Sequence, residues 1–176
     1  MSTILTLHDP QIARAYYAKG WWRDDTLYSL LRRHAEQRPE AYALRDSRRR
    51  LTWSRLLRWV DVVAAQLNAV GLKRGQRVSV WLPNRVEAVV VFLACSRNGY
   101  VCNPSLHQNY TVEEIVRLLE RIQAAALFAQ PGYGADADRN DVFRQAAALA
   151  CMKRVYALEP PDGGSGTPAG AVAFPA

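Results

Sequence analysis

The sequence predicts an α/β fold, in which an N-terminal β-hairpin and helices precede an open, mostly parallel sheet with crossover helices. From residue 77 to residue 158, short apolar segments alternate with longer segments of helical periodicity. This alternation is typical of parallel strands joined by right-handed crossovers. Before it, the short segments 42–45 and 50–53 flank a polar turn, which favours a β-hairpin.

The organisation of the chain follows from where turn-forming and linker-like residues collect. We expect residues 1–25 to form an irregular arm, which Trp21 and Trp22 pin onto the body because aromatic rings bury large areas. Residues 26–158 predict one α/β unit, long enough for a core of its own. Residues 159–176 are rich in Pro and Gly and predict a flexible linker.

Helices are predicted where an apolar stripe follows a residue that can cap a helix N-terminus. The expected caps are Thr26, Ser54, Asn84 and Thr111, the last with Glu114 in a capping box. The expected ends are Pro39, Gly71 and Asn98-Gly99, and a weaker helix is expected over 139–150.

The helix after Asn84 is apolar on nearly every side. Such a helix is buried on more than one side, so we expect Phe92 and Leu93 to lie at the centre of the core. Strands are expected on either side of this helix and after it, over residues 78–82, 100–103, 124–129 and 154–158.

A formal net charge of +7, almost entirely from arginine, could attract nucleic acid. The arginines are scattered, however, and the one tight run, 48–50, is interpreted as a solvated turn between two strands. The tryptophans do not alternate with basic residues as base-stacking platforms do. Nucleic-acid binding is therefore not predicted.

The sequence also indicates where the protein resides. The longest strongly apolar run, 86–95, is too short to span a bilayer, and the first residues carry no pattern of a secretory signal. Cys95, Cys102 and Cys151 show neither zinc-ligand spacing nor close pairing. Reduced thiols in a cytoplasm fit them best, with Cys95 as a buried structural thiol.

Candidate catalytic and metal-ligating side chains do not form a constellation. The histidines are far apart and lack Cys or carboxylate neighbours at ligand spacing, and no serine lies in a nucleophile-elbow motif. The considered residues are His8, His34, His107, Ser96, Ser105 and Ser165, with Asp24, Asp25, Asp136 and Asp138 as possible metal ligands. Asp25 is better explained as charge at a helix N-terminus. We predict no catalytic, cofactor-binding or metal-binding residue in this chain.

One glycine-rich stretch, Gly163 to Pro168, superficially suggests a phosphate-binding loop. A phosphate cradle needs successive backbone N–H groups and usually a nearby cation. No Lys or Arg follows this stretch, and Pro168 removes an N–H, so a plain linker is the better interpretation.

The order of several segments resembles the N-terminal part of adenylate-forming (AMP-dependent) acyl-CoA synthetases. The resemblance covers about residues 22–158. The segments that carry it are Thr26–Leu31 with Pro39, Ala43–Asp46, Leu51–Leu56, Val70–Glu87, Gly99–Leu106 and Tyr110–Ile115. Gln76 stands where the family usually has Asp, and the region around Asn103-Pro104 is compressed. Gly20–Thr26 and Tyr133–Asp136 look most like the cyclohexanecarboxylate-CoA ligase or medium-chain branch.

This resemblance implies an enzyme that activates a carboxylic acid with ATP and Mg²⁺ and transfers the acyl group to coenzyme A. The family's phosphate-binding loop and later motifs do not match any part of this sequence, so no family catalytic residue carries over. The chain by itself is expected to bind none of these cofactors and to be inactive. It is expected to self-associate through an exposed apolar face. A stand-alone α/β interaction or small-molecule-binding module derived from the family is the alternative.

Overall fold

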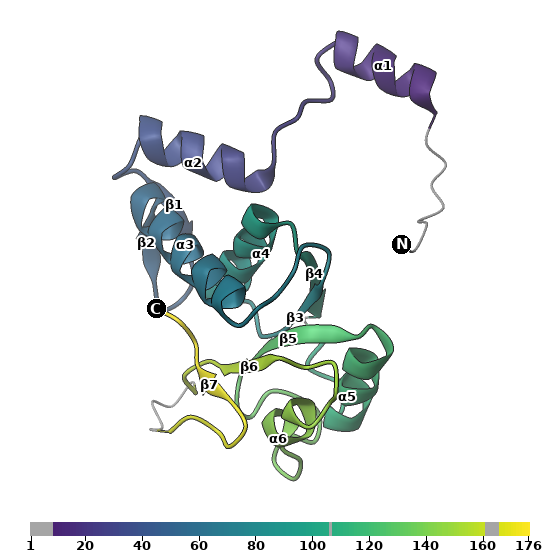
Figure 1. The fold of residues 1–176 in the computed structure, drawn as a ribbon. Helices are drawn as coiled ribbons and strands as arrows, with labels where there is room; N and C mark the ends of the chain where they lie inside the picture. The colour runs from purple at the N-terminus through teal and green to yellow at the C-terminus, as the bar shows by residue number, and fades with distance from the viewer. Residues whose placement is uncertain (1–8, 106, 161–165) are drawn as a thin grey trace.

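The computed structural model describes residues 9–105, 107–160 and 166–176, and its elements between residues 27 and 157 follow the predicted order (Figure 1). The helices are α1 (Pro10–Ala18), α2 (Leu27–Gln37), α3 (Trp53–Ala69), α4 (Val86–Asn98), α5 (Val112–Arg121) and α6 (Val142–Ala147). The strands are β1 (Tyr42–Arg45), β2 (Arg50–Thr52), β3 (Arg77–Trp81), β4 (Val101–Ser105), β5 (Ala124–Ala129), β6 (Arg154–Ala157) and β7 (Val172–Ala173).

The central sheet is parallel, with strand order β4-β3-β5-β6-β7, while β1 and β2 form the predicted antiparallel hairpin. Helices α3 and α4 cover one face of this sheet, and α5 and α6 cover the other (Figure 1). The connection from β3 to β4 runs toward one edge of the sheet, whereas those from β4 to β5 and from β5 to β6 run toward the other. Because all of these crossovers are right-handed, the helix of the first lies on the opposite face from the helices of the other two. The predicted α/β fold is confirmed.

Each face of the sheet has its own apolar layer. On one side Val60 and Val63 of α3 and Val90 of α4 are fully buried against the sheet, and on the other side Ile115 and Leu119 of α5 are buried. Strand β5 is buried at every position because it lies between both layers. The unit therefore has the core that its length predicted.

Two predicted capping motifs are present. The Thr26 side chain accepts a hydrogen bond from the backbone N–H of Ser29, and Ser29 reciprocates. Thr111 and Glu114 form the predicted capping box at the start of α5. Gly99 ends α4 with φ of 70°, a conformation that glycine adopts without strain.

Other predicted helix boundaries were wrong by a few residues. Helix α3 is capped by Thr52 rather than Ser54. Helix α6 spans six residues instead of the expected 139–150, and it begins at Val142, where Asp141 accepts hydrogen bonds from the backbone N–H groups of Phe143 and Arg144. Asn84 does not cap α4; the residue in the cap position is Arg85, whose side chain makes no capping hydrogen bond.

The N-terminal arm differs from the prediction. Residues 10–18 are helical, and α1 projects away from the body (Figure 1). Trp21 and Trp22 do not pin the arm onto the body, since they remain 66% and 45% exposed. Their rings pack instead on Tyr16 and Tyr17 of the same arm, at centroid distances of 5.2–5.9 Å. These aromatic rings therefore pack on one another within the arm rather than on the body.

The predicted flexible linker, 159–176, contains regular structure near its end. Strand β7 pairs with β6, and the indole N–H of Trp59 donates to the carbonyl oxygen of Pro175 at 2.7 Å. Phe174 packs against Trp59 and Phe128. Residues 161–165, which include the first half of the glycine-rich stretch, lie outside the described residues. The prediction of a linker over the whole of 159–176 was therefore wrong.

Helix α4 packs against the sheet and α3, as predicted, but the residues that it buries are not the ones expected. Val90 and Val91 are fully buried, whereas Phe92 is 42% exposed and Leu93 is half-buried. The placement of Phe92 at the centre of the core was wrong. A helix apolar on nearly every side thus leaves one apolar stripe toward solvent.

Candidate functional site

The strand order locates the edge of the sheet where a site is expected. From β3 the chain moves outward to β4 and then returns across β3 to form β5, so its direction reverses between β3 and β5. In open parallel sheets, ligands bind outside the carboxyl ends of the strands at such a reversal. Here Arg85 follows the end of β3 and Gln130 follows the end of β5.

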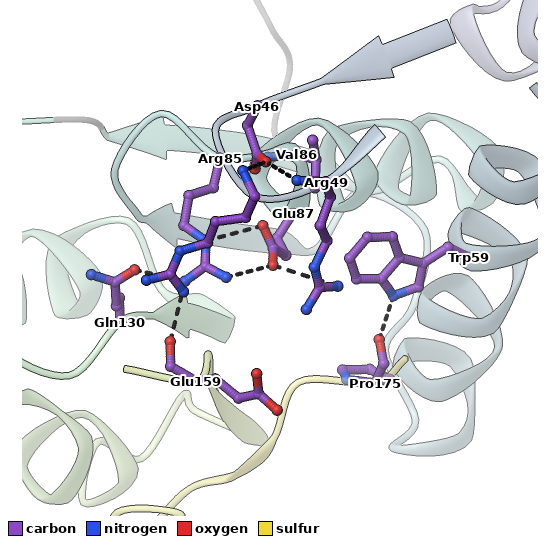
Figure 2. A network of polar contacts seen from close by, with 10 residues as sticks. Asp46, Arg49, Trp59, Arg85, Val86, Glu87, Gln130, Glu159 and Pro175 are labelled. Carbon is purple, nitrogen blue, oxygen red and sulfur yellow. Dashed lines mark hydrogen bonds and ion pairs between the residues drawn. The ribbon is translucent and has the colours of Figure 1, made fainter. Parts of the chain in front are cut away.

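Arg85 connects the carboxyl ends of three strands (Figure 2). Its Nη1 donates to Gln130 Oε1 at 2.9 Å and to the carbonyl oxygen of Glu159, beyond β6, at 3.1 Å. Its Nε and Nη2 donate to the two carboxylate oxygens of Glu87 at 3.2 and 2.7 Å. The side chains of Arg85 and Glu87 are only 9% and 3% exposed, so the pair is buried and bidentate.

Asp46, in the hairpin turn, caps the helix that carries Glu87. Its carboxylate accepts from the backbone N–H groups of Arg48 and Arg49 and, at 3.0 Å, from that of Val86. Desolvation raises the pKa of Asp46, but these backbone hydrogen bonds outweigh it and hold the pKa below its ordinary value. The cap that Asn84 was expected to provide is therefore supplied by a residue 40 positions away in sequence from Val86.

Arg49, in the hairpin turn, also lies beside Glu87. Its guanidinium lies 5.0 Å from the centroid of the Trp59 ring, and Nη1 lies 3.8 Å from Glu87 Oε1. The side chain stays 39% exposed. The arginine run 48–50 is exposed, as expected for a solvated turn, but its middle member also contributes to this cluster.

A cavity of about 510 Å³ opens beside the cluster. Trp59 and Phe174 form aromatic walls, and Arg49, Arg85 and Glu87 supply its charged groups. The remaining lining comes from residues around β6 and β7: Ala157, Leu158, Glu159, Pro160, Gly166, Thr167, Ala173 and Ala176. Arg49, whose side chain is partly exposed, thus lies at a largely apolar cavity at the carboxyl ends of the strands.

Most candidate residues from the sequence have structural roles. Asp136 accepts from the backbone N–H of Val112 and so stabilises the beginning of α5. Asp25 pairs with Arg23 and Arg33 on the surface. The Ser96 hydroxyl accepts from the backbone N–H of Tyr28.

The remaining candidates are scattered over the molecule. His34 packs on Trp53, His107 on Tyr110, and Asp138 pairs with Arg139. Asp24 lies in the segment before α2, and Ser105 ends β4. His8 and Ser165 lie outside the described residues. Within the described ranges, no three His, Cys, Asp or Glu side chains gather as a possible metal site.

Cys95 is buried, as predicted, and has a contact that the sequence did not indicate. A hydrogen bond with Cys102, together with burial, raises the pKa of the Cys95 thiol. A thiol that stays protonated is unreactive, which agrees with a structural role.

The sequence analysis missed Arg49, Arg85, Glu87 and Gln130. One signal was available: Arg85 and Glu87 are charged residues at the point where a buried strand passes into an apolar helix. Charged residues are rarely buried unless they are paired. Arg49 and Gln130 gave no local signal, since their proximity depends on the packing of the hairpin and the strand order.

Comparison with known proteins agrees with this architecture. The sequence matches the AMP-binding enzyme family over residues 31–170, and the chain belongs to that family. It is 34% identical over 122 residues to 2-hydroxy-7-methoxy-5-methyl-1-naphthoate–CoA ligase of Streptomyces carzinostaticus, covering 69% of this chain and 22% of the relative. It is 31% identical over 130 residues to medium-chain fatty-acid–CoA ligase of Escherichia coli (strain K12), covering 73% and 23%.

The fold also matches solved structures. The apo structure of MbtA from Mycobacterium smegmatis superposes with a TM-score of 0.68 at 30% identity, covering 86% of this chain and 28% of that one. The architecture is that of part of the N-terminal domain of adenylate-forming enzymes. The chain thus spans about a quarter of the length of these relatives.

Within the described residues, no helix is both long and apolar enough to cross a membrane.

Proposed function

We propose that this chain is the N-terminal part of an ATP-dependent acid–CoA ligase, which converts a carboxylate, ATP and coenzyme A into acyl-CoA, AMP and pyrophosphate. The observation that carries this proposal is the family match over residues 31–170, reinforced by the same sheet in a solved relative. Two relatives more than 30% identical are named as acid–CoA ligases, which supports this reaction class.

The branch of the family is part of the same proposal. The segment Gly20–Thr26 favours the cyclohexanecarboxylate or medium-chain branch, and a medium-chain fatty-acid–CoA ligase is among the relatives. We place the enzyme in the cytoplasm because its cysteines suit a reducing compartment.

In this proposal the chain contributes scaffold rather than chemistry. Holding a triphosphate requires convergent amide donors, a cation and Mg²⁺ to offset the developing charge. At the carboxyl edge of the sheet, the guanidinium of Arg85 already donates hydrogen bonds to Glu87, Gln130 and the carbonyl oxygen of Glu159. We therefore assign the binding of ATP, Mg²⁺ and coenzyme A to other parts of the ligase.

The first prediction concerns activity. The purified 176-residue chain, given ATP, Mg²⁺, coenzyme A and either cyclohexanecarboxylate or octanoate, should release no pyrophosphate above a buffer control. The reason is that the proposed scaffold lacks the phosphate-binding groups. A coupled pyrophosphate assay checks this, with the medium-chain ligase of Escherichia coli as positive control. Release that requires both ATP and acid would show that the chain is a complete catalyst.

The second candidate function, a stand-alone small-molecule-binding module, is favoured by one observation. The cavity beside Trp59 has a volume and a mixed apolar and charged lining that suit a small ligand without any contribution from a further domain. A phosphate-binding loop encoded in frame after residue 176 would favour the ligase. Its absence there would favour the module.

A further inference from the structure

The β-hairpin places two arginines directly opposite each other. Arg45 ends β1 and Arg50 begins β2, and the two are cross-strand partners in the register of the hairpin. Residues in such a pair leave the same face of the sheet, with Cβ atoms about 4.5–5.5 Å apart. Two positive charges at this spacing repel each other and destabilise the hairpin. The pair is therefore unfavourable unless an anion lies close to both side chains.

The described part of the chain does not supply that anion. Within the described ranges, neither Arg45 nor Arg50 forms an ion pair with a carboxylate, and both side chains are exposed. Asp46 follows Arg45 directly, but its carboxylate accepts hydrogen bonds from three backbone N–H groups, including that of Val86. Those hydrogen bonds direct its oxygens toward the backbone of the turn and the beginning of α4.

An aromatic ring holds one of the two arginines in place. The Cζ atom of Arg50 lies 4.5 Å from the centroid of the Tyr42 ring, and Tyr42 is 67% exposed. A guanidinium that stacks on a ring keeps its N–H donors, which lie in its own plane, available for a second partner. Tyr42 thus fixes Arg50 at the surface without using its hydrogen-bond donors.

An open hollow of about 420 Å³ lies at the turn between the two strands. Residues 45–50 line it, and four of these residues are arginines. Its one carboxylate, that of Asp46, is the group already engaged by backbone N–H donors. The hollow therefore combines a concentration of positive charge with room for a small anion.

The paired arginines suit one class of anion better than others. A phosphate monoester has three acceptor oxygens and about two negative charges at neutral pH, so it can accept from two guanidinium groups at once. A carboxylate has two oxygens and a single charge, and one guanidinium satisfies it. A nucleic acid carries one charge per phosphate, and Arg50 already covers a face of the Tyr42 ring on which a base would stack.

From these observations we propose that the hairpin turn binds a phosphate monoester group between Arg45 and Arg50. The bound group offsets the repulsion between the two cations, and Tyr42 orients Arg50 toward it. The group belongs either to a soluble phosphate ester or to a lipid headgroup of the same chemistry. This site requires neither ATP nor a carboxylic acid, so it does not depend on the function proposed for the parent enzyme.

Glycerol 3-phosphate is the soluble probe, and its binding is followed through the backbone ¹H–¹⁵N resonances of residues 46–50. Sodium chloride at the same ionic strength is the reference, because it screens charge without bridging two arginines. We expect glycerol 3-phosphate to shift these resonances saturably and to raise the urea midpoint of the chain above its value in sodium chloride.

Arg45→Gln and Arg50→Gln each remove one side of the proposed clamp. Each should weaken binding of glycerol 3-phosphate about tenfold or more and abolish its effect on the urea midpoint. Arg55→Gln is the matched control, since Arg55 is an exposed arginine of α3 without an ion pair in the described ranges, and it should leave binding unchanged. In sodium chloride, Arg45→Gln should not lower the urea midpoint, because it relieves the repulsion between the two cations.

Co-sedimentation with phosphatidylcholine vesicles that contain or lack phosphatidic acid distinguishes the two sources. Binding to phosphatidic acid that requires Arg45 and Arg50, without a response to glycerol 3-phosphate, identifies a lipid headgroup. The converse identifies a soluble ester. The proposal is overturned if neither probe binds, if sodium chloride reproduces the resonance shifts, or if Arg45→Gln and Arg55→Gln weaken binding equally.

Discussion

Glu87 is a carboxylate at the beginning of an apolar helix, with its side chain only 3% exposed. Removing such a charge from water is costly, and it is tolerated here because Arg85 meets it through two hydrogen bonds. The same contact orients Arg85 toward Gln130 and Glu159. Pairing of these two residues thus stabilises the edge at which three strands end.

Breaking this pair should be more costly than breaking a pair on the surface. We expect Glu87→Gln to lower the free energy of unfolding by about 3–5 kcal/mol, because it leaves Arg85 charged, buried and incompletely paired. The control is Glu36→Gln, which disrupts the exposed pair with Arg32 and should cost less than about 1 kcal/mol. Urea titration followed by far-UV circular dichroism measures both.

A double variant tests whether the loss of stability comes from leaving Arg85 charged and unpaired. Replacing both residues, as Arg85→Met with Glu87→Leu, should recover part of the lost stability, since no unpaired charge remains. Equal, small shifts for Glu87→Gln and Glu36→Gln would mean that the buried pair does not matter for stability.

At the scale of elements, α4 shows where periodicity is informative and where it is not. Its apolar character correctly predicted a crossover helix against the sheet and α3. Its composition did not distinguish Val91, which is fully buried, from Phe92, which is 42% exposed. When nearly every position is apolar, the pattern has no polar side that marks the direction of solvent.

This pair of neighbours gives a direct test of the helix orientation. Val91→Ala should cost about 1.5–3 kcal/mol, the contribution of burying such a side chain. Phe92→Ala should cost less than Val91→Ala, although it removes more atoms, because Phe92 is 42% exposed. The urea midpoints of the two variants compare them. A larger loss for Phe92→Ala would mean that α4 is rotated from the orientation described.

Helix caps divide between those that local sequence specifies and those that it does not. Thr111 and Glu114 are three residues apart, so their capping box could be recognised from spacing alone. The cap of α4 comes from Asp46 in the hairpin turn. Its recognition required knowing that the turn packs against the end of β3.

At the scale of the whole molecule, helices cover both faces of the sheet, but several large apolar side chains stay exposed, among them Val101 of the edge strand β4 and Phe92 of α4. The arm carries Ile12, Tyr17, Trp21 and Trp22 as exposed apolar side chains, and Figure 1 shows α1 standing apart from the body. An apolar surface of this kind commonly marks an interaction site. We propose that the isolated chain self-associates through it.

Sedimentation velocity over a range of concentrations tests self-association. We expect the weight-average sedimentation coefficient of the chain to rise with concentration, and the combined change Trp21→Ser and Trp22→Ser to suppress that rise. Tyr42→Ser is the control, since Tyr42 is a 67% exposed aromatic residue outside the arm. A monomer at all concentrations, or equal effects of both variants, would exclude the arm as the contact.

The sequence by itself determined the α/β class, the parallel strands, the hairpin, the Thr26 cap and the capping box of Thr111 and Glu114. Periodicity and spacing of neighbouring residues are sufficient for these, because they depend on contacts within one turn of helix or one strand. The order of several segments also indicated the AMP-binding family, which comparison confirmed.

Only the tertiary structure decided which side chains meet at the carboxyl edge of the sheet. Arg49, Arg85, Gln130 and Glu159 lie far apart in sequence and converge because β3, β5 and β6 end side by side beneath the hairpin turn. The pairing of β7 and the projection of the arm were decided in the same way. Each depends on which surfaces of the folded body remain uncovered and can bury another segment. A local pattern of residues does not contain that information.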